Sequence, residues 1–326
     1  MKKLSLLLVV IMILASVSVV FAETTRTPGA DKLIDDPVMG VTTTFKKYDA
    51  KFYDKESAQP GTIVRLDYTT DVYGEILNQW ANVYLPYGYD EAKQYNIIYF
   101  LHGTNETQTS FIGDARAKNA MDGIIEAGVT EPFIMVFPCY YYDYENRAID
   151  MNNFVQEVRK DLMPAVESTY STYAETADEA GFIASREHRA FGGYSRGCYA
   201  AWHMFFHNLD YAYWYMPFSA NISGPEEMSL GMPVEEQIAM LKEAIDRQAA
   251  YKDSFYIYAA CGGGRDMMYD VNNALITAML AETDYFSYGQ DKTVNNLYYC
   301  QSKEIHQTLI SRYYLYNAFD VVFKKI

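Results

Sequence analysis

The sequence has little positive charge for its length. Its 326 residues contain 27 Lys and Arg against 42 Asp and Glu, which gives a formal net charge of −15 at pH 7. Proteins that bind nucleic acid through its phosphates carry clustered basic residues, and anionic lipid repels an acidic protein. The composition therefore argues against nucleic acid as a partner and favours a substrate that is neutral or very large.

Cysteine is also scarce, with four residues in the whole chain: Cys139, Cys198, Cys261 and Cys300. Four are too few for a disulfide framework in a chain of this length, and all four lie in apolar surroundings, where buried free thiols are common. Sequence alone does not decide their redox state. If one pair is bridged, Cys261 and Cys300 are the best candidates, because both fall on strands expected to be neighbours.

Long hydrophobic runs are absent except at the start. Two lysines precede an almost wholly apolar run over residues 4–20, and Val-Phe-Ala at 20–22 forms a suitable cleavage site. This arrangement is typical of a secretory signal peptide over residues 1–22, so we expect a secreted, extracellular protein. Because the run is long for a signal, an uncleaved N-terminal membrane anchor is the alternative. No membrane association is expected after cleavage.

The interior has no linker rich in proline or serine, no internal repeat and no low-complexity tract. About 300 residues are enough for one large α/β domain. We therefore expect residues 23–58 to form a polar, extended leader and residues 59–326 to form a single domain. The sequence does not set its oligomeric state.

The strand pattern changes along the chain. Residues 62–68 and 80–85 predict an antiparallel hairpin with a turn around Gly74. Continuously apolar runs then alternate with stretches of helical period, as expected for strands covered on both faces. These runs occupy residues 97–101, 133–137, 190–194, 213–218, 255–260 and 297–300. The pattern predicts an α/β fold with a mostly parallel central sheet, helices on both faces and an antiparallel N-terminal hairpin.

A Gly-Tyr-Ser-Arg-Gly motif occupies residues 193–197, between an apolar run and a helix-compatible stretch at 198–206. A serine hydroxyl becomes a useful nucleophile when a sharp strand-to-helix turn presents it to a base, and the close passage of the backbone there requires small neighbours. The motif alone is a weak signal, but this context makes it specific. It predicts an α/β-hydrolase with Ser195 as nucleophile; the alternative is an ordinary turn serine.

Five histidines could supply the general base: His102, His188, His203, His207 and His306. The first two precede Ser195, whereas this fold places the histidine last. The next two are spaced i, i+4 on one helix, but no adjacent glutamate completes a zinc motif, so packing is the better interpretation. His306 follows the last strand, and we assign it proton transfer to and from Ser195. No metal and no cofactor are expected.

The acid of the triad should follow the strand at 255–260. Asp266 does so and would hold the imidazole in one tautomer. Asp270, one helical turn further on, is the alternative, and a helix cap is the non-catalytic interpretation of either. The main-chain N–H of Thr104, after the first central strand, can meet that of Arg196, so we assign the oxyanion hole to these two groups.

Several ordered motifs resemble those of carbohydrate esterase family 1, the feruloyl and acetyl-xylan esterases related to esterase D. They are Tyr-Leu-Pro-Tyr-Gly-Tyr at 84–89, Ile-Tyr-Phe-Leu-His-Gly at 98–103, Arg-Glu-His-Arg-Ala at 186–190 and Arg-Tyr-Tyr-Leu-Tyr-Asn at 312–317. The likeness covers about residues 60–322. Arg196, Gly197 and Cys198 stand where the family usually has Met and two glycines, and Ile305 stands where it usually has glycine. These departures alter the acyl pocket.

The resemblance implies an esterase of xylan degradation that removes feruloyl or related hydroxycinnamoyl groups, or acetyl groups, from plant cell-wall xylan. Export and acidity both suit this large, neutral polymer. An acyltransferase on the same fold is an alternative, because the acyl-enzyme is shared and only the acceptor differs. A non-catalytic polysaccharide-binding protein is another.

A tyrosine-rich stretch follows the strand at 133–137 and should therefore rim the mouth of the site. Tyr140, Tyr141 and Tyr142 could stack there on sugar rings or phenolic acids, although a generally tyrosine-rich surface is an equal alternative. His102 is a further candidate for substrate contact, and we expect it to shape its loop without transferring protons.

Overall fold

The computed structural model describes residues 32–36, 41–46, 55–113, 116–222 and 232–324. The expected signal peptide and most of the expected leader lie outside these residues. Within them, no helix is both long and apolar enough to cross a bilayer.

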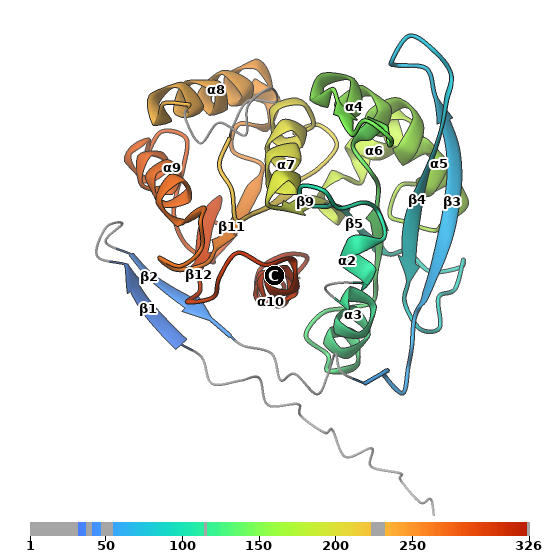
Figure 1. Cartoon of the computed structure of the whole chain (residues 1–326), viewed down its shortest axis with the longest axis horizontal. Helices are drawn as coiled ribbons and strands as arrows, with labels where there is room; N and C mark the ends of the chain where they lie inside the picture. Colours follow the sequence, from blue (N-terminus) through green and yellow to red (C-terminus); the bar gives the residue numbers. More distant parts are fainter. Residues whose placement is uncertain (1–31, 37–40, 47–54, 114–115, 223–231, 325–326) are drawn as a thin grey trace, which may run out of the picture.

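An eight-stranded sheet forms the centre of the molecule (Figure 1). Its strands are β3 (Thr62–Thr70), β4 (Leu77–Leu85), β5 (Asn96–Leu101), β6 (Phe133–Phe137), β9 (Arg189–Tyr194), β10 (Trp214–Phe218), β11 (Tyr256–Cys261) and β12 (Leu297–Gln301). They lie in the order β12-β11-β10-β9-β5-β6-β4-β3. The β3–β4 and β4–β6 pairs are antiparallel and the remaining pairs are parallel. The predicted mostly parallel sheet with an antiparallel N-terminal hairpin is confirmed.

Helices cover both faces of this sheet, as predicted, and each face has its own hydrophobic core (Figure 1). One face carries α4 (Met151–Glu157), a π-helical turn (Val158–Leu162), α5 (Met163–Thr169), α6 (Glu179–Ala184), α7 (Arg196–His207), α8 (Val234–Arg247) and α9 (Tyr269–Ala281). The other carries α2 (Ser110–Gly113), α3 (Ala117–Glu126) and α10 (Thr308–Ala318). The parallel-paired strands β5, β6, β9, β10, β11 and β12 are buried along their whole length because both faces are covered, whereas the edge strand β3 is partly exposed.

Two small hairpins stand apart from the main sheet: β1 (Lys32–Asp36) with β2 (Val41–Phe45), and β7 (Tyr141–Asp143) with β8 (Ala148–Ile149). The first belongs to the expected leader, so this part of it is not merely extended. Phe45 packs edge-on against Tyr313 and Tyr314 of α10, and the Gln301 N–H donates to Thr43 Oγ1 at 3.2 Å. Strand β2 is therefore fastened to the edge of the domain beside β12.

All four cysteines are free and buried. The pair favoured from sequence, Cys261 and Cys300, does lie on neighbouring strands, but the register opposes Cys300 to Ala260 and Cys261 to Gln301. Side chains alternate between faces along a strand, so a one-residue offset puts the two thiols on opposite faces of the sheet. They fall in different hydrophobic cores, and a bridge between them is excluded.

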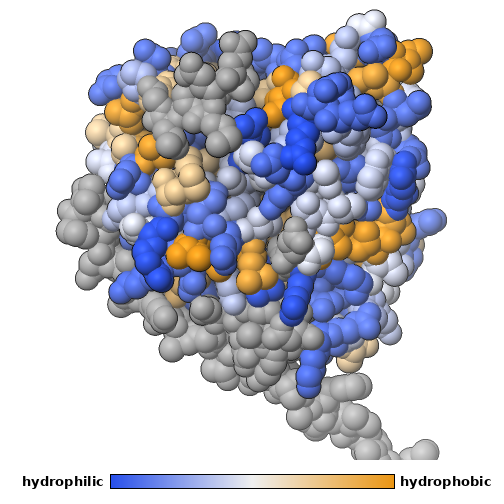
Figure 2. Space-filling model, viewed as in Figure 1, coloured by the Kyte–Doolittle hydropathy of each residue, from blue (hydrophilic) through white to orange (hydrophobic). Residues whose placement is uncertain are grey.

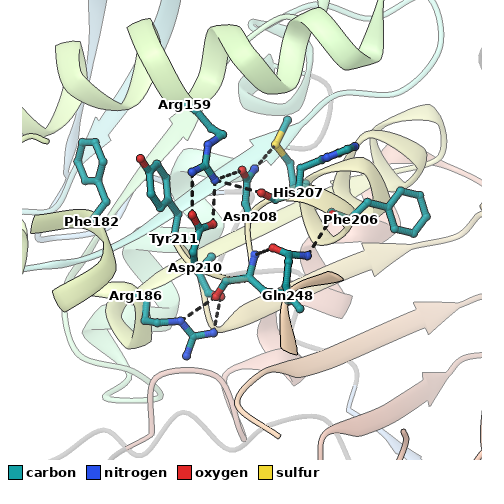
Figure 3. A network of polar contacts seen from close by, with 12 residues as sticks. Arg159, Phe182, Arg186, Phe206, His207, Asn208, Asp210, Tyr211 and Gln248 are labelled. Atoms are coloured by element: carbon teal, nitrogen blue, oxygen red, sulfur yellow. Dashed lines mark hydrogen bonds and ion pairs between the residues drawn. The ribbon is translucent and has the colours of Figure 1, made fainter. Parts of the chain in front are cut away.

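A polar network holds the end of α7 and the turn that leads to β10 (Figure 3). Arg159, on the π-helical turn, pairs with Asp210 at 2.7 Å and donates to Asn208 Oδ1 at 2.8 Å. Arg186 donates to the carbonyl of Leu209 at 2.8 Å. These charge-assisted bonds fix the C-terminal end of α7. The opposite end of the same helix begins directly after Ser195.

The surface seen in Figure 2 is mainly hydrophilic, and its apolar residues form separate patches. Large hydrophobic side chains that are exposed include Ile76, Met267 and Val294, which lie in different loops. Such dispersed apolar residues are ordinary for a protein surface and do not define a docking face.

Candidate active site

Ser195 sits in a sharp turn between β9 and α7. Its backbone has φ 56° and ψ −119°, which is an unusual conformation for a residue with a side chain. The turn is held in place by a hydrogen bond from the Ser195 N–H to the Phe218 carbonyl on β10, at 2.9 Å. A strained backbone conformation of this kind persists where the surrounding structure enforces it. The turn leaves the Ser195 hydroxyl outside the regular hydrogen bonding of strand and helix.

The two glycines of the motif are required by close backbone contacts. A Cβ on Gly193 would lie 2.2 Å from the Gly197 carbonyl oxygen, and one on Gly197 would lie 2.1 Å from that of Leu101. Neither distance is tolerable for any side chain, and in both cases the obstacle is main chain that cannot rotate away. The Gly-x-Ser-x-Gly pattern is therefore the only one that lets β9, α7 and the end of β5 meet here.

His306 connects the serine to an acid. Its Nε2 lies 3.0 Å from Ser195 Oγ and its Nδ1 lies 2.8 Å from Asp266 Oδ1. Asp266 follows β11 and His306 follows β12, so both reach the site from carboxyl ends of parallel strands, where sites in such sheets gather. Asp270 instead begins the first turn of α9. The structure thus brings together the three residues expected from chain order, with Asp266 and not Asp270 on the histidine.

The Asp266 carboxylate is buried and held by several donors. Burial opposes its ionisation, but hydrogen bonds from His306 and from the Met268 N–H outweigh this and keep the pKa of the carboxyl below its ordinary value. The Gly262 N–H adds a further bond at 3.2 Å. A carboxylate fixed in this way stays charged at neutral pH and can orient the imidazole.

The loop after β5 passes beside the turn that carries Ser195. Arg196 Nε donates to Thr104 Oγ1 at 3.3 Å, which places the two residues assigned to the oxyanion hole side by side. A Cβ on Gly103 would lie 3.6 Å from Ser195 Cβ, so this loop passes close to the serine.

Glu106, in the same loop, was not predicted from the sequence to belong to the site. Its Oε2 accepts from the Gly103 N–H at 2.7 Å, and its Oε1 accepts from the hydroxyl of Thr308, which opens α10 two residues after His306. Glu106 therefore fastens the loop of the expected oxyanion hole to the segment that carries the histidine. Because Thr308 is 202 positions away, nothing local distinguishes Glu106 from a surface carboxylate.

His102 is enclosed beneath the loop. Its ring stacks on Tyr140 with centroids 4.1 Å apart, Nδ1 lies 2.9 Å from the Gly103 carbonyl oxygen, and Nε2 lies 3.1 Å from Cys139 Sγ. Burial lowers the pKa of His102 to about 4, so the ring is neutral at neutral pH. These contacts suit a residue that shapes the loop.

The tyrosines expected to rim the mouth mostly lie below the surface. Tyr140 and Tyr141 are buried, and their hydroxyls bond the main chain of the loop at Gly103 and Asn105. Tyr142 is partly exposed and stacks on Tyr73 at 4.8 Å. The expectation of an exposed aromatic rim was wrong for the first two, because the main chain turns into the short β7–β8 hairpin and packs them inward.

Of the two histidines on α7, His203 packs in the interior and His207 does not. His203 is buried edge-on against Tyr199 and Phe206, and burial lowers its pKa to about 4. His207 is exposed at the end of the helix. In the part of the chain that the structure describes, no three His, Cys, Asp or Glu side chains are grouped to hold a metal ion.

Comparison with known proteins gives one family match. The sequence model of the Esterase family matches residues 78–275. Endo-1,4-beta-xylanase Y of Acetivibrio thermocellus is 36% identical over 267 residues, covering 81% of this chain and 23% of that protein. An endo-1,4-beta-xylanase/feruloyl esterase of Xylanibacter ruminicola is 28% identical over 143 residues and is matched over 19% of its length. The chain thus spans a quarter or less of these curated relatives.

Solved structures extend the comparison. A feruloyl esterase module from Clostridium thermocellum, solved as a serine-to-alanine mutant with sinapinate, is 33% identical with a TM-score of 0.76. The match covers 85% of this chain and 93% of that module. A ferulic acid esterase from Anaeromyces mucronatus shares the fold at 18% identity and a TM-score of 0.63, over 84% of this chain and 96% of the other.

Proposed function

This chain belongs to the Esterase family and is a carboxylic ester hydrolase of the carbohydrate esterase family 1 type, and we propose that it releases hydroxycinnamic acids, ferulic acid foremost, from xylan through an acyl-enzyme on Ser195. The observation that carries the proposal is the hydrogen-bonded series of Ser195, His306 and Asp266 at the carboxyl ends of the sheet.

The geometry supports a two-step acyl transfer. His306 Nε2 is placed to take the proton from Ser195 Oγ as the oxygen attacks the ester carbonyl. The same nitrogen then returns that proton to the departing sugar hydroxyl, which leaves the acyl group on the serine. Water then gives a proton to His306 and attacks the acyl-enzyme, and His306 returns that proton to Ser195 Oγ as the acyl–oxygen bond breaks and the acid is released. Asp266 holds the imidazole in one tautomer and stabilises the imidazolium in both steps.

The main-chain N–H groups of Thr104 and Arg196 are proposed as donors to the developing oxyanion. Glu106 occupies the Gly103 N–H, so the next N–H along the loop, that of Thr104, is the one left for the substrate. Removing one preorganised donor of this kind typically raises the barrier by about 3–4 kcal/mol.

Relatives and charge both favour feruloylated xylan as the substrate. The Clostridium thermocellum module was solved with sinapinate, a hydroxycinnamate, and both curated relatives carry xylanase names. A neutral polysaccharide is indifferent to the net charge of −15, whereas an acidic one would be repelled. Acetyl groups are the second candidate acyl group.

Export is part of the proposal, since polymeric xylan cannot enter a cell. The lysines and apolar run at residues 2–20 support a signal peptide that ends at Ala22. Expression of the full chain in a secreting bacterial host, followed by N-terminal sequencing of the protein in the medium, should give Glu23 as the first residue. Protein retained in the membrane fraction would show an anchor instead.

Ser195→Ala tests the proposed chemistry. It should lower kcat on methyl ferulate and on 4-nitrophenyl acetate by about 10⁵-fold or more, because the attacking oxygen is removed. Ser168→Ala, which alters an exposed serine of α5, is the matched control and should keep full activity. Retained activity in Ser195→Ala would refute the assignment. Faster release of ferulate than of acetate, from feruloylated and acetylated xylan, is the result expected for the acyl preference.

A further inference from the structure

We propose that a cavity at the amino ends of β5, β9 and β10 binds a sugar unit of a neutral polysaccharide, separately from the active site. Asn96 opens β5, Trp214 opens β10, and His188 directly precedes β9; all three line the cavity. Ser195 follows the opposite end of β9, about 20 Å away for a six-residue strand. The choice of ligand rests on the proposed function.

The cavity has the size and lining of a small-molecule site. Its volume is about 380 Å³, and its walls combine aromatic rings, among them Tyr173, Tyr213 and Trp214, with a few polar groups. Ligand sites in proteins typically enclose roughly 300–1,000 Å³ and are lined mainly by apolar and aromatic side chains with a few polar groups.

One wall is a fixed aromatic pair. The rings of Tyr173 and His188 stack with centroids 3.4 Å apart and planes 10° apart. His188 Nδ1 lies 2.7 Å from Asn96 Oδ1, which locks the imidazole and the amide together. This wall needs little reorganisation to receive a ligand, so little binding free energy is lost on ordering it.

A second group of lining residues is equally constrained. The Trp214 indole N–H donates to the Glu187 carbonyl at 2.8 Å, and Tyr213 packs edge-on against the same ring at 4.7 Å. Lys292 lies 5.1 Å over the Trp214 ring and donates to the Lys324 carbonyl at 2.6 Å. Trp214 is only 2% exposed and supports this part of the lining from behind, whereas the half-buried rings of Tyr213 and Tyr173 offer surface on which the C–H face of a pyranose ring can pack.

A buried polar group supplies the second argument. Asn96 is 6% exposed and lines the cavity, and its Oδ1 is engaged by His188. Its Nδ2 donates to no atom among the described residues. Asn96 Nδ2 is not among the fully enclosed polar atoms that lack a partner, so this donor is open to the cavity that Asn96 lines. A ligand hydroxyl in the cavity would satisfy it.

Charge selects a neutral ligand. Two carboxylates, Glu131 and Glu187, and two ammonium groups, Lys292 and Lys324, line the cavity, so its formal charge is balanced in a chain of net charge −15. An anion would meet the carboxylates and a cation would meet the lysines. A sugar hydroxyl can donate to the first and accept from the second without a net charge of its own.

Affinity electrophoresis in gels that contain de-esterified xylan tests the site, because this polymer offers no ester to the catalytic serine. The parent protein should be retarded. Tyr173→Ala and Tyr213→Ala should each weaken retardation about tenfold, as expected for the loss of one aromatic contact. Tyr87→Ala, which removes a tyrosine that is 57% exposed outside the cavity, is the matched control and should be retarded like the parent.

Hydrolysis of methyl ferulate separates the two proposals. All three tyrosine variants should retain the kcat and KM of the parent, which also shows that they are folded. Parent protein that migrates freely in xylan, or cavity variants retarded as strongly as Tyr87→Ala, would overturn the sugar site while leaving the esterase intact. Retardation of a parent that does not hydrolyse methyl ferulate would refute the proposed function alone.

Discussion

The two ends of strand β9 are built in opposite ways. At its start, Arg189 is fully buried and makes five hydrogen bonds, two of them to the Glu167 carboxylate at 2.7 and 2.8 Å. At its other end, Ser195 occupies a strained backbone conformation, and its turn is crowded by Gly193 and Gly197. Arg189, whose guanidinium donors are all bonded, thus lies only six positions before Ser195, whose backbone is strained.

This contrast suggests how the strain is tolerated. A strained turn persists only if the elements that carry it cannot relax, and the Arg189–Glu167 pair clamps β9 to α5 while the Arg159 network clamps α7 (Figure 3). We infer that stability is concentrated at the amino end of the strand and chemistry at the carboxyl end. Substitutions at the two ends should therefore affect different measurements.

After the loss of the proposed nucleophile in Ser195→Ala, the largest effect on chemistry alone is expected from Asp266→Asn. The amide keeps the shape of the side chain and can still accept from Met268, but it favours the wrong tautomer of His306. We expect kcat on methyl ferulate to fall about 10⁴-fold. Asp270→Asn is the matched control, because Asp270 lies on the first turn of α9 while Asp266 is the carboxylate bonded to the histidine; it should keep activity within a few-fold.

The same variant also tests how the free energy of unfolding depends on pH in acid. The pKa of the Asp266 carboxyl is lowered on folding, so the carboxylate adds stability above the ordinary value of 3.8 that is lost as pH falls through the folded pKa. The free energy of unfolding of Asp266→Asn, measured in urea, should therefore depend less steeply on pH below about 4 than that of the parent. An equally steep dependence would show that the carboxylate is not held as described.

The largest effect on stability is expected at the other end of β9. Arg189→Met leaves the Glu167 carboxylate buried without its cation, with only the hydroxyls of Tyr99 and Thr172 as donors. Breaking a buried pair in this way should lower the free energy of unfolding by about 3–5 kcal/mol. Folded protein should keep kcat within a few-fold, because the change lies a full strand length from the serine.

Arg159→Met is the variant with which the loss of stability in Arg189→Met should be compared. Its pair with Asp210 is partly exposed, at 18% and 22%, so removal should cost less, about 1–2 kcal/mol. Adding Glu167→Gln to Arg189→Met should restore part of the lost stability, since no unpaired charge then remains buried. Equal losses for Arg189→Met and Arg159→Met would contradict the proposed concentration of stability at the start of β9.

Much of the fold follows from local patterns. Continuous apolar runs predicted each parallel strand, and the order Ser195, Asp266, His306 identified the residues that the structure brings together, because chain order and strand ends are visible in a sequence. The glycines of the motif were predicted for the correct reason, a close backbone approach.

The remainder depends on contacts between distant segments. Glu106 meets Thr308 across 202 positions, and Arg189 meets Glu167 across 22, so in the sequence both acids resemble ordinary surface charges. Whether Cys261 lies opposite Cys300 depends on the register of the two strands. A continuously apolar pattern does not fix that register to one residue, because a one-residue shift would keep apolar side chains on both buried faces.

Glu106 gives a smaller test near the catalytic end. If it positions the loop of Thr104 relative to His306, Glu106→Ala should lower kcat about 10- to 100-fold with little change in KM, because the oxyanion forms only in the transition state. Glu106→Gln keeps an acceptor for the Gly103 N–H and should recover most of the activity. An alanine variant with the parent's kcat, or a loss confined to KM, would remove Glu106 from the positioning role.

The smallest expected effect tests the strain itself. Glycine adopts φ near +56° without the cost that a Cβ imposes, although its unfolded chain has more conformational entropy to lose on folding. We expect the first effect to be larger, so that the free energy of unfolding of Ser195→Gly exceeds that of Ser195→Ala by about 1 kcal/mol. Both variants lack the hydroxyl of the proposed nucleophile, so they differ only in the Cβ. Calorimetry should place the glycine variant roughly 2 °C higher in Tm. A glycine variant no more stable than the alanine variant would mean that the turn stores little strain, and the two ends of β9 would then differ in chemistry but not in backbone energy.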